Sequence, residues 1–171
     1  KPVNLMPGPP LDRNDDETIT REFMADETAK HVVSGGTSAT ILSRELGRRL
    51  RVSLDYTDPD IPPIAFMDGI DLVTEGVLTL RRAIELLHRY LEQCDLSQDF
   101  FEELDKKNGA SMLAKLLIED CTELHLFVGT AVNSAYQNPG LPFDLGIRQN
   151  LVRQLAETVE RMGKKVTVTY Y

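Results

Sequence analysis

The sequence predicts a three-layer α/β fold, Rossmann-like, in which a mostly parallel sheet carries helices on both faces. Short apolar runs that end at Gly or Pro alternate with longer stretches whose apolar residues recur at helical spacing. Strands and helices that alternate in this way join as right-handed crossovers. The 171 residues suffice for one well-formed core. We therefore expect a single domain that spans residues 1–171.

Five apolar runs predict the strands of this sheet, and each of the first four is followed by a turn signal. We expect their central residues to lie in one sheet, mainly parallel, and these residues are Leu5, Val33, Leu72, Leu126 and Val168. The runs occupy residues 3–6, 31–33, 70–73, 124–128 and 166–170. Residues 51–54 suggest a further strand, and the prolines of residues 58–63 indicate a turn or an extended connection.

Helical spacing of apolar residues predicts the segments between the strands. A first helix begins with Asn14 or Asp15 as its cap and runs to about Met24. The second has Leu42, Leu46 and Leu50 on one stripe. The clearest amphipathic pattern contains Leu80, Ala83, Ile84, Leu87 and Leu91. The charged residues 97–107 indicate a short helix or a loop, and further helices are predicted around Leu113, Leu116 and Leu117 and from Ile147 to a stop at Gly163.

Composition excludes two classes of partner. The net charge is −8 and the pI is about 4.9, so the average surface repels both nucleic acid and anionic lipid. No apolar run reaches the length of a membrane span.

Cys94 and Cys121 lie in helical patterns without a neighbouring Cys or His cluster, which indicates reduced thiols and a cytoplasmic location. The early acidic residues predict a solvated helix face rather than a metal site.

Small residues are concentrated in three of the predicted β-α loops, where ligands of parallel sheets gather. The strongest loop is Ser34, Gly35, Gly36, Thr37 and Ser38. Its glycines let backbone amides approach an anion, its hydroxyls can donate, and a helix begins behind it. The loop lacks the lysine of a P-loop and the spacing of a dinucleotide motif. We expect it to bind phosphate, and the alternative is a tight turn in which Thr or Ser caps the helix.

Two further loops extend this predicted pocket. Thr74, Glu75 and Gly76 follow the third strand, where the carboxylate could accept from a ribose hydroxyl or an amine. The other loop contributes Gly129, Thr130 and Asn133. Ordinary turns are the alternative for both loops.

The histidines His31, His88 and His125 lie in unrelated elements, so we expect neither a metal cluster nor a Ser-His-Asp arrangement.

Several motifs, taken in order, carry a resemblance to a known family. They are Val3-Asn4-Leu5-Met6-x-Gly8-Pro9-Pro10, Asn14-Asp15-Asp16, Val32-Val33-Ser34-Gly35-Gly36-Thr37, Ile61-Pro62-Pro63-Ile64, residues 69–76, residues 135–139 and residues 164–171. Together they resemble the C-terminal region of bacterial serine/threonine phosphatases of the stage II sporulation protein E family. The likeness covers nearly the whole chain. It implies that a metal-dependent phosphatase domain, absent from this chain, precedes this region.

The resemblance carries over no catalytic residue, since the family's catalytic aspartates and its manganese or magnesium ions belong to that preceding domain. Our leading interpretation is an accessory or regulatory domain that binds a small phosphate-bearing ligand at its β-α loops and acts on the attached phosphatase. The second interpretation is a structural or dimerising module without a ligand, for which a homodimer is expected. The third is an enzyme on a phosphorylated metabolite with Glu75 as base, although no complete catalytic set is present.

Overall fold

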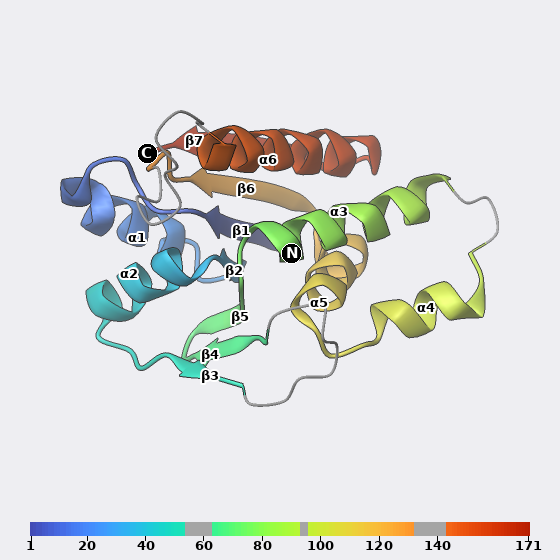
Figure 1. Ribbon diagram of the computed structural model, residues 1–171, viewed down its shortest axis with the longest axis horizontal. Coiled ribbons are helices and arrows are strands. Elements are labelled where there is room, and N and C mark those ends of the chain that lie inside the picture. The colour runs from blue at the N-terminus through green and yellow to red at the C-terminus, as the bar shows by residue number, and fades with distance from the viewer. Residues whose placement is uncertain (54–62, 93–95, 132–142) are drawn as a thin grey trace.

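A computed structural model of the chain describes residues 1–53, 63–92, 96–131 and 143–171, and for residues 143–145 it describes the backbone alone. Within these residues one sheet has the strand order β3-β4-β5-β2-β1-β6-β7 (Figure 1). The strands are β1 (Pro2–Pro7), β2 (Lys30–Ser34), β3 (Arg51–Val52), β4 (Ala65–Met67), β5 (Ile70–Thr74), β6 (Glu123–Val128) and β7 (Lys165–Tyr170). The helices are α1 (Asp16–Met24), α2 (Gly36–Leu46), α3 (Val77–Glu92), α4 (Gln98–Leu104), α5 (Gly109–Lys115) and α6 (Phe143–Arg161), with a 3₁₀ turn η1 (Arg13–Asp15) and a π-helical turn η2 (Leu116–Asp120).

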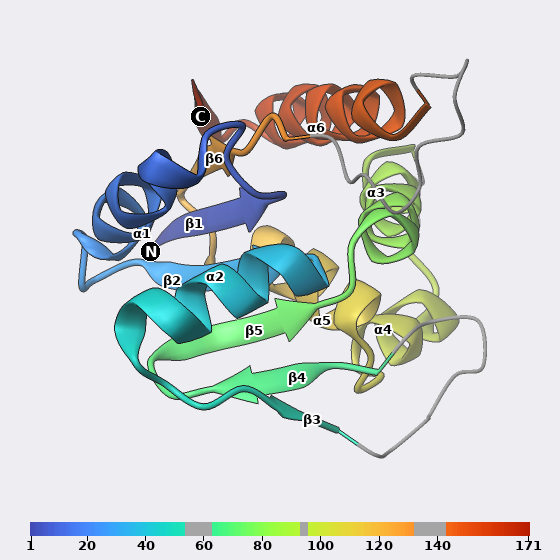
Figure 2. The same ribbon diagram turned by 60° about the vertical axis from the view of Figure 1, so that its left-hand side comes forward.

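The sheet is mostly parallel, as the sequence predicts. Strands β5, β2, β1, β6 and β7 run in one direction, and β4 runs antiparallel to both β3 and β5. The five predicted central residues all lie in strands of this one sheet, so that prediction is confirmed. The parallel strands are ordered third, second, first, fourth, fifth along the chain, which is the order of a doubly wound sheet. All their carboxyl ends therefore meet at one edge, and Figure 2 shows β1 and β5 pointing the same way.

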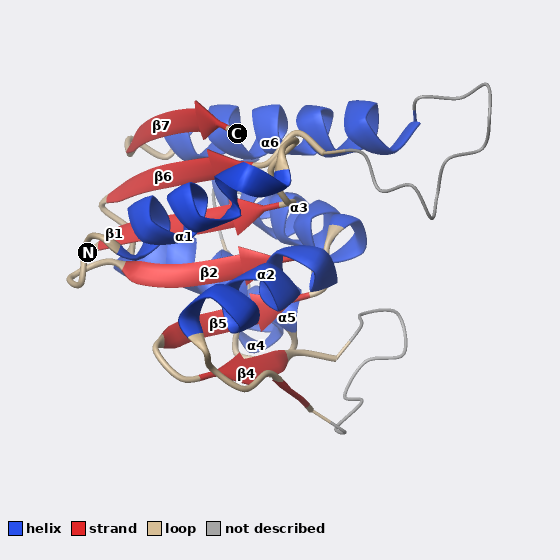
Figure 3. Cartoon of the chain, turned by 90° about the vertical axis from the view of Figure 1, so that its left-hand side faces the viewer, coloured by secondary structure: helices blue, strands red, loops and turns tan. Residues whose placement is uncertain are grey.

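Helices cover both faces of the sheet, and each face has its own apolar core. Helices α1 and α2 pack on one face through Ile19, Phe23 and Leu42, against Met6 and Val33. Helices α3, α4, α5 and α6 pack on the other face against residues that include Leu5, Leu72 and Leu126. Figure 3 shows α1 and α2 in front of the sheet and α3 and α6 behind it. The three-layer, Rossmann-like α/β fold is thus confirmed.

Four details differ from the sequence prediction. Strand β4 was not predicted, because three residues beyond a proline pair carry no alternating pattern. Helix α2 ends at Leu46, since Gly47 adopts a left-handed conformation (φ 63°), and Leu50 packs against the α1/α2 core from beyond the helix. Cys121 is buried as expected but follows η2 in an extended conformation. Of the strand suggested for residues 51–54, β3 takes only Arg51–Val52, and Leu54 lies outside the described residues.

Candidate functional site: a crevice between β2 and β5

In two pairs of adjacent strands, one strand leads to a helix on one face of the sheet and its neighbour leads to a helix on the opposite face. After β1 the chain continues to α1 and after β2 to α2, on one face. After β5 it continues to α3, and the helix that follows β6 is α6, both on the other face. Adjacent strands whose connections diverge in this way leave a crevice beyond their carboxyl ends. The β1/β6 and β2/β5 pairs are therefore the two places where a ligand could enter.

The chain itself fills the crevice between β1 and β6. Gly129 lies so close to the backbone of Pro9 that a Cβ there would overlap the Pro9 carbonyl group. The amide of Ala131 donates to the same Pro9 oxygen (3.1 Å). Thr130 donates to the Tyr171 carbonyl oxygen from its amide (2.9 Å) and from its hydroxyl (2.7 Å). The loop after β6 thus packs on the loop after β1, and both Thr130 donors already have a partner.

The loops after β2 and β5 lie in direct contact. The amide of Gly35 donates to the Thr74 carbonyl oxygen (2.8 Å), and the Ser34 hydroxyl donates to the Glu75 carbonyl oxygen (3.3 Å). A Cβ built on Gly76 would lie 3.8 Å from the Gly35 Cα atom. Two of the three predicted loops therefore form one site. Asn133, predicted in the third loop, lies outside the described residues.

Both helices that leave this crevice begin at a glycine. The carbonyl oxygen of Gly35 accepts the first helical hydrogen bond of α2 from Ala39 N (3.1 Å), and that of Gly76 does the same in α3 from Leu80 N (3.1 Å). Glycine has no side chain with which to cap the free amides of a first turn. The alternative in which Thr or Ser caps α2 is therefore wrong, because Gly35 holds the N-cap position and no side chain caps it.

The backbone at Gly35 explains why glycine is required there. Its φ is 116° and its ψ is 138°, a region that is essentially restricted to glycine. Gly36 has no positive φ, and a Cβ built on it would meet no described residue within 4 Å. Gly36 and Thr37 are exposed. The described part of the chain therefore leaves the first turn of α2 uncovered at these two residues.

A buried hydroxyl without a partner lies behind this turn. The Ser38 side chain is fully buried, and its Oγ has no hydrogen bond among the described residues. This oxygen lies 3.9 Å from the position of a Cβ built on Gly35, so it faces the loop. The Thr74 Oγ1 atom at the end of β5 is also buried and unpartnered in the described chain. Buried polar atoms are nearly always satisfied by protein, water or a ligand.

The electrostatics of the crevice combine two helix N-termini with one carboxylate. Each N-terminus carries about half a positive charge, and the free amides point outward. Glu75 is exposed, and its side chain has no hydrogen bond or ion pair with any other described residue. The crevice can therefore hold an anion at the amides, with a hydroxyl or amine of the same molecule at Glu75.

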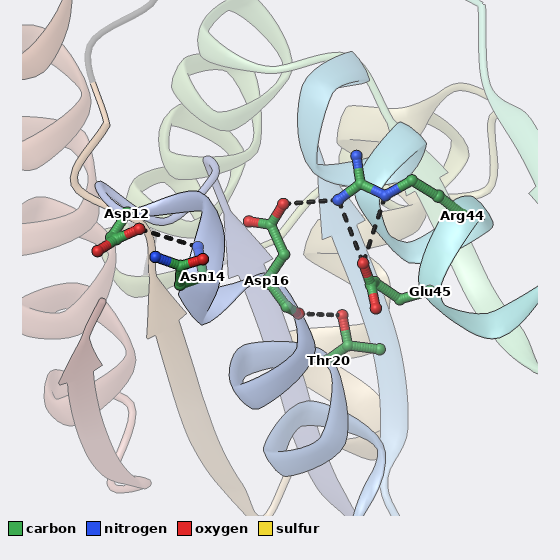
Figure 4. Close-up of polar contacts among 6 residues, drawn as sticks. All are labelled: Asp12, Asn14, Asp16, Thr20, Arg44 and Glu45. Carbon is green, nitrogen blue, oxygen red and sulfur yellow. Dashed lines mark hydrogen bonds and ion pairs between the residues drawn. The ribbon is translucent and has the colours of Figure 1, made fainter.

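The acidic residues before and within α1 do not converge on a metal site. The Asp16 carboxylate is buried and pairs with Arg44 (2.6 Å), while Asp12 accepts a hydrogen bond from the Asn14 amide (2.9 Å) (Figure 4). Arg44 also pairs with Glu45 (3.2 Å). No group of three potential metal ligands occurs in the part of the chain that the structure describes. The prediction of a solvated helix face holds for the exposed acids but not for Asp16, which joins α1 to α2.

The histidines lie apart from the crevice. The ring of His88 contacts the Thr158 hydroxyl (3.1 Å), and that of His125 contacts the Thr167 hydroxyl (2.5 Å). His31 is buried against Phe23, and burial lowers the pKa of its imidazole. A groove of about 300 Å³ runs between α3 and α6, and none of the predicted site residues that the structure describes lines it. Its lining residues include Arg81, Glu85 and His88.

Sequence reasoning missed one cation at this edge of the sheet. Arg148 on α6 places its guanidinium over Gly8, where a Cβ would overlap the Nη1 atom. Its Nη2 atom donates to the Ala131 carbonyl oxygen (2.5 Å). Nothing in the local sequence marks this arginine, because it lies in an ordinary helical pattern far along the chain from Gly8.

Comparisons with protein-family models, with curated proteins and with solved structures found no match for this chain. Among the described residues no helix combines the length and the apolar character needed to cross a membrane.

Proposed function

We propose that this chain is a regulatory domain that binds a small phosphate-bearing ligand in the crevice between β2 and β5. One observation carries the proposal: the loops that start α2 and α3 at glycines contact each other beside the buried hydroxyl of Ser38, which has no partner among the described residues. Backbone amides at a helix N-terminus bind phosphate through hydrogen bonds and the helix dipole together. The hydroxyls of Thr37 and Ser38 supply further donors.

We further propose that the domain acts on the phosphatase domain of a stage II sporulation protein E-like polypeptide. This part of the proposal rests on the sequence motifs alone. A ligand changes the activity of an attached domain only if it binds more tightly to one state of the whole protein than to another. The crevice is a place where such a difference could arise, because its two walls belong to helices on opposite faces of the sheet.

A specific observation favours a second candidate, a dimerising module. Strand β7 forms one edge of the sheet and exposes Val168 and Tyr170. A six-residue edge strand with apolar side chains invites pairing with another chain. A dimer whose stability does not respond to any phosphate-bearing compound would favour this candidate over ligand binding.

A thermal-shift screen with nucleoside monophosphates and sugar phosphates tests the leading proposal. We expect at least one compound to raise the melting temperature of the wild type. A ligand at one hundred times its dissociation constant stabilises by about 2.7 kcal/mol, which corresponds to roughly 5–10 °C for a domain of this size. If no phosphate-bearing compound shifts the wild type, the proposal is wrong.

Thr37→Ala is the matched variant for this screen. Thr37 is exposed and its hydroxyl does not cap α2, so we expect the unliganded variant to keep its stability within about 0.5 kcal/mol. Loss of one hydrogen bond to the ligand should reduce the ligand-induced stabilisation by about 1 kcal/mol. An identical shift in variant and wild type would show that the Thr37 hydroxyl does not bond to the ligand.

A further inference from the structure

Strand β7 is an edge strand without the protection that such strands generally have. It is the last strand in the sheet order, and no described strand lies beyond it (Figure 3). Its six residues include one charge, at Lys165, and no proline or glycine. Soluble proteins prevent edge strands from pairing by short length, charged residues, prolines or bulges. The opposite edge follows this rule, since β3 has two residues and begins with Arg51.

The backbone of Tyr171 shows which groups of β7 point away from the sheet. The Tyr171 amide donates to the Val128 oxygen (2.9 Å), and the Tyr171 oxygen accepts from the Thr130 amide (2.9 Å), so both groups face the β6 side. Backbone groups of successive residues in a strand point to opposite sides. The residues of β7 whose amide and carbonyl groups point outward are therefore Val166, Val168 and Tyr170. No described strand is paired with β7 on that side.

The side chains of the same three residues form an apolar row. Val166 is level with Leu124 of β6 and packs against the core on the α6 face of the sheet. Val168 and Tyr170 follow on this face, because side chains two residues apart in a strand share a face. They are 38% and 63% exposed. Unpaired backbone groups beside exposed apolar side chains are the features that an added strand covers.

The sequence of β7 is complementary to itself in an antiparallel arrangement. When Val168 faces Val168 of the partner subunit, Val166 faces Tyr170 of the partner subunit, and Thr167 faces Thr169 of the partner subunit. Every outward-pointing residue then meets another, and each such pair exchanges both backbone hydrogen bonds. Apolar pairs lie on one face and threonine pairs on the other, and both kinds stabilise a sheet. The two Lys165 side chains lie at opposite ends of the paired strands, so these like charges do not meet.

We propose that β7 pairs in this register with β7 of a second copy of the chain, so that two sheets join across a two-fold axis at Val168. A two-fold dimer is the commonest oligomer and needs only one self-complementary surface. This inference rests on the dimerising candidate and adds to it the partner and the register. It does not depend on the ligand site, because β1 and β6 separate β7 from the crevice between β2 and β5.

Sedimentation equilibrium with a charge-swap pair tests the inference. We expect the average mass of the wild type to rise from 19.2 kDa toward twice that value between about 1 and 500 μM. Val168→Lys and Val168→Glu each place two like charges opposite each other on the axis, so each variant alone should dimerise at least about tenfold more weakly. An equal mixture of the two variants should dimerise at least as tightly as the wild type, because opposite charges then face each other.

Val52→Lys is the matched control, since Val52 is an exposed valine (60%) on the opposite edge strand, and it should leave the dimer unchanged. A wild type that stays monomeric to about 500 μM would overturn both this inference and the dimerising candidate, and the ligand site would stand. A dimer that Val168→Lys does not weaken would show that another surface forms it. A mixture that does not regain affinity would overturn the register.

Amide hydrogen exchange of the wild type keeps the test independent of variant folding. Dimer formation should slow exchange at the three outward-pointing amides, which are those of Val166, Val168 and Tyr170. The amides of Thr167 and Thr169 bond to β6 in both states, so their exchange should change little with concentration. A dimer in which the outward-pointing amides exchange as fast as in the monomer would overturn the inference.

Discussion

Replacing Gly129 with Ala is expected to destabilise the folded protein by about 3 kcal/mol, the upper end of the usual cost of overpacking. The added Cβ would overlap the Pro9 carbonyl group and come close to the Gly8 oxygen. These are backbone atoms, and the Pro9 oxygen is also held by the Ala131 amide. The loop after β1 would have to move away from β6, and the contacts that close the β1/β6 crevice would be lost.

Thermal unfolding of Gly129→Ala, followed by circular dichroism, measures this loss. A domain of this size loses about 2–4 °C of melting temperature per kcal/mol, so we expect a decrease of about 6–12 °C. Gly36→Ala is the matched control, because its φ is not positive and a Cβ there meets nothing within 4 Å. The control should be neutral or more stable by up to about 1 kcal/mol. Equal stabilities of the two variants would contradict the close contact of the β1 and β6 loops.

Replacing Gly36 with Val is expected to abolish ligand-induced stabilisation while leaving the fold intact. The new side chain would stand on the first turn of α2, whose amides are proposed to hold the anion, and no described residue lies within 4 Å of its Cβ. No backbone strain is added, since the positive φ belongs to Gly35. The unliganded stability should stay within about 0.5 kcal/mol of the wild type. The stabilisation of about 2.7 kcal/mol expected at saturating ligand should disappear.

The measurement is the melting temperature of wild type, Gly36→Ala and Gly36→Val with and without the best compound from the screen. The smaller alanine side chain should give an intermediate ligand-induced shift. A full shift in Gly36→Val would place the ligand elsewhere on the protein. A large loss of unliganded stability would show that Gly36 has a packing role that the structure does not reveal.

The main elements of the fold could be predicted because local signals agree with the tertiary structure. Four of the five central residues of the predicted strands, namely Leu5, Val33, Leu72 and Leu126, lie in buried runs that end at glycine, proline or a small polar residue. Such runs are typical of parallel strands covered on both faces. Strand β4 carries no such signal, since its three residues gain their conformation from pairing with β5 across the turn at Gly69 (φ 82°). Tertiary pairing, rather than local sequence, determines that strand.

The candidate site could be predicted in part. The glycine-rich loop and the Thr74–Gly76 loop are visible in the sequence, but their contact depends on the strand order, which places β5 beside β2. The same order separates them from Gly129, which packs on Pro9 instead. Arg148 could not be predicted, because its position depends on how α6 packs against the tip of β1. Local motifs identify loops, whereas the sheet topology decides which loops meet.

A crystal structure of the wild-type protein grown with selenate tests the central claim most directly, because the anomalous signal of selenium locates the anion without ambiguity. We expect a peak within hydrogen-bond distance of the amides of Gly36 and Thr37, and no peak at this position in Gly36→Val. An ordered loop with no anion beside it, or selenate bound only elsewhere on the molecule, would contradict the claim that the crevice between β2 and β5 is an anion site.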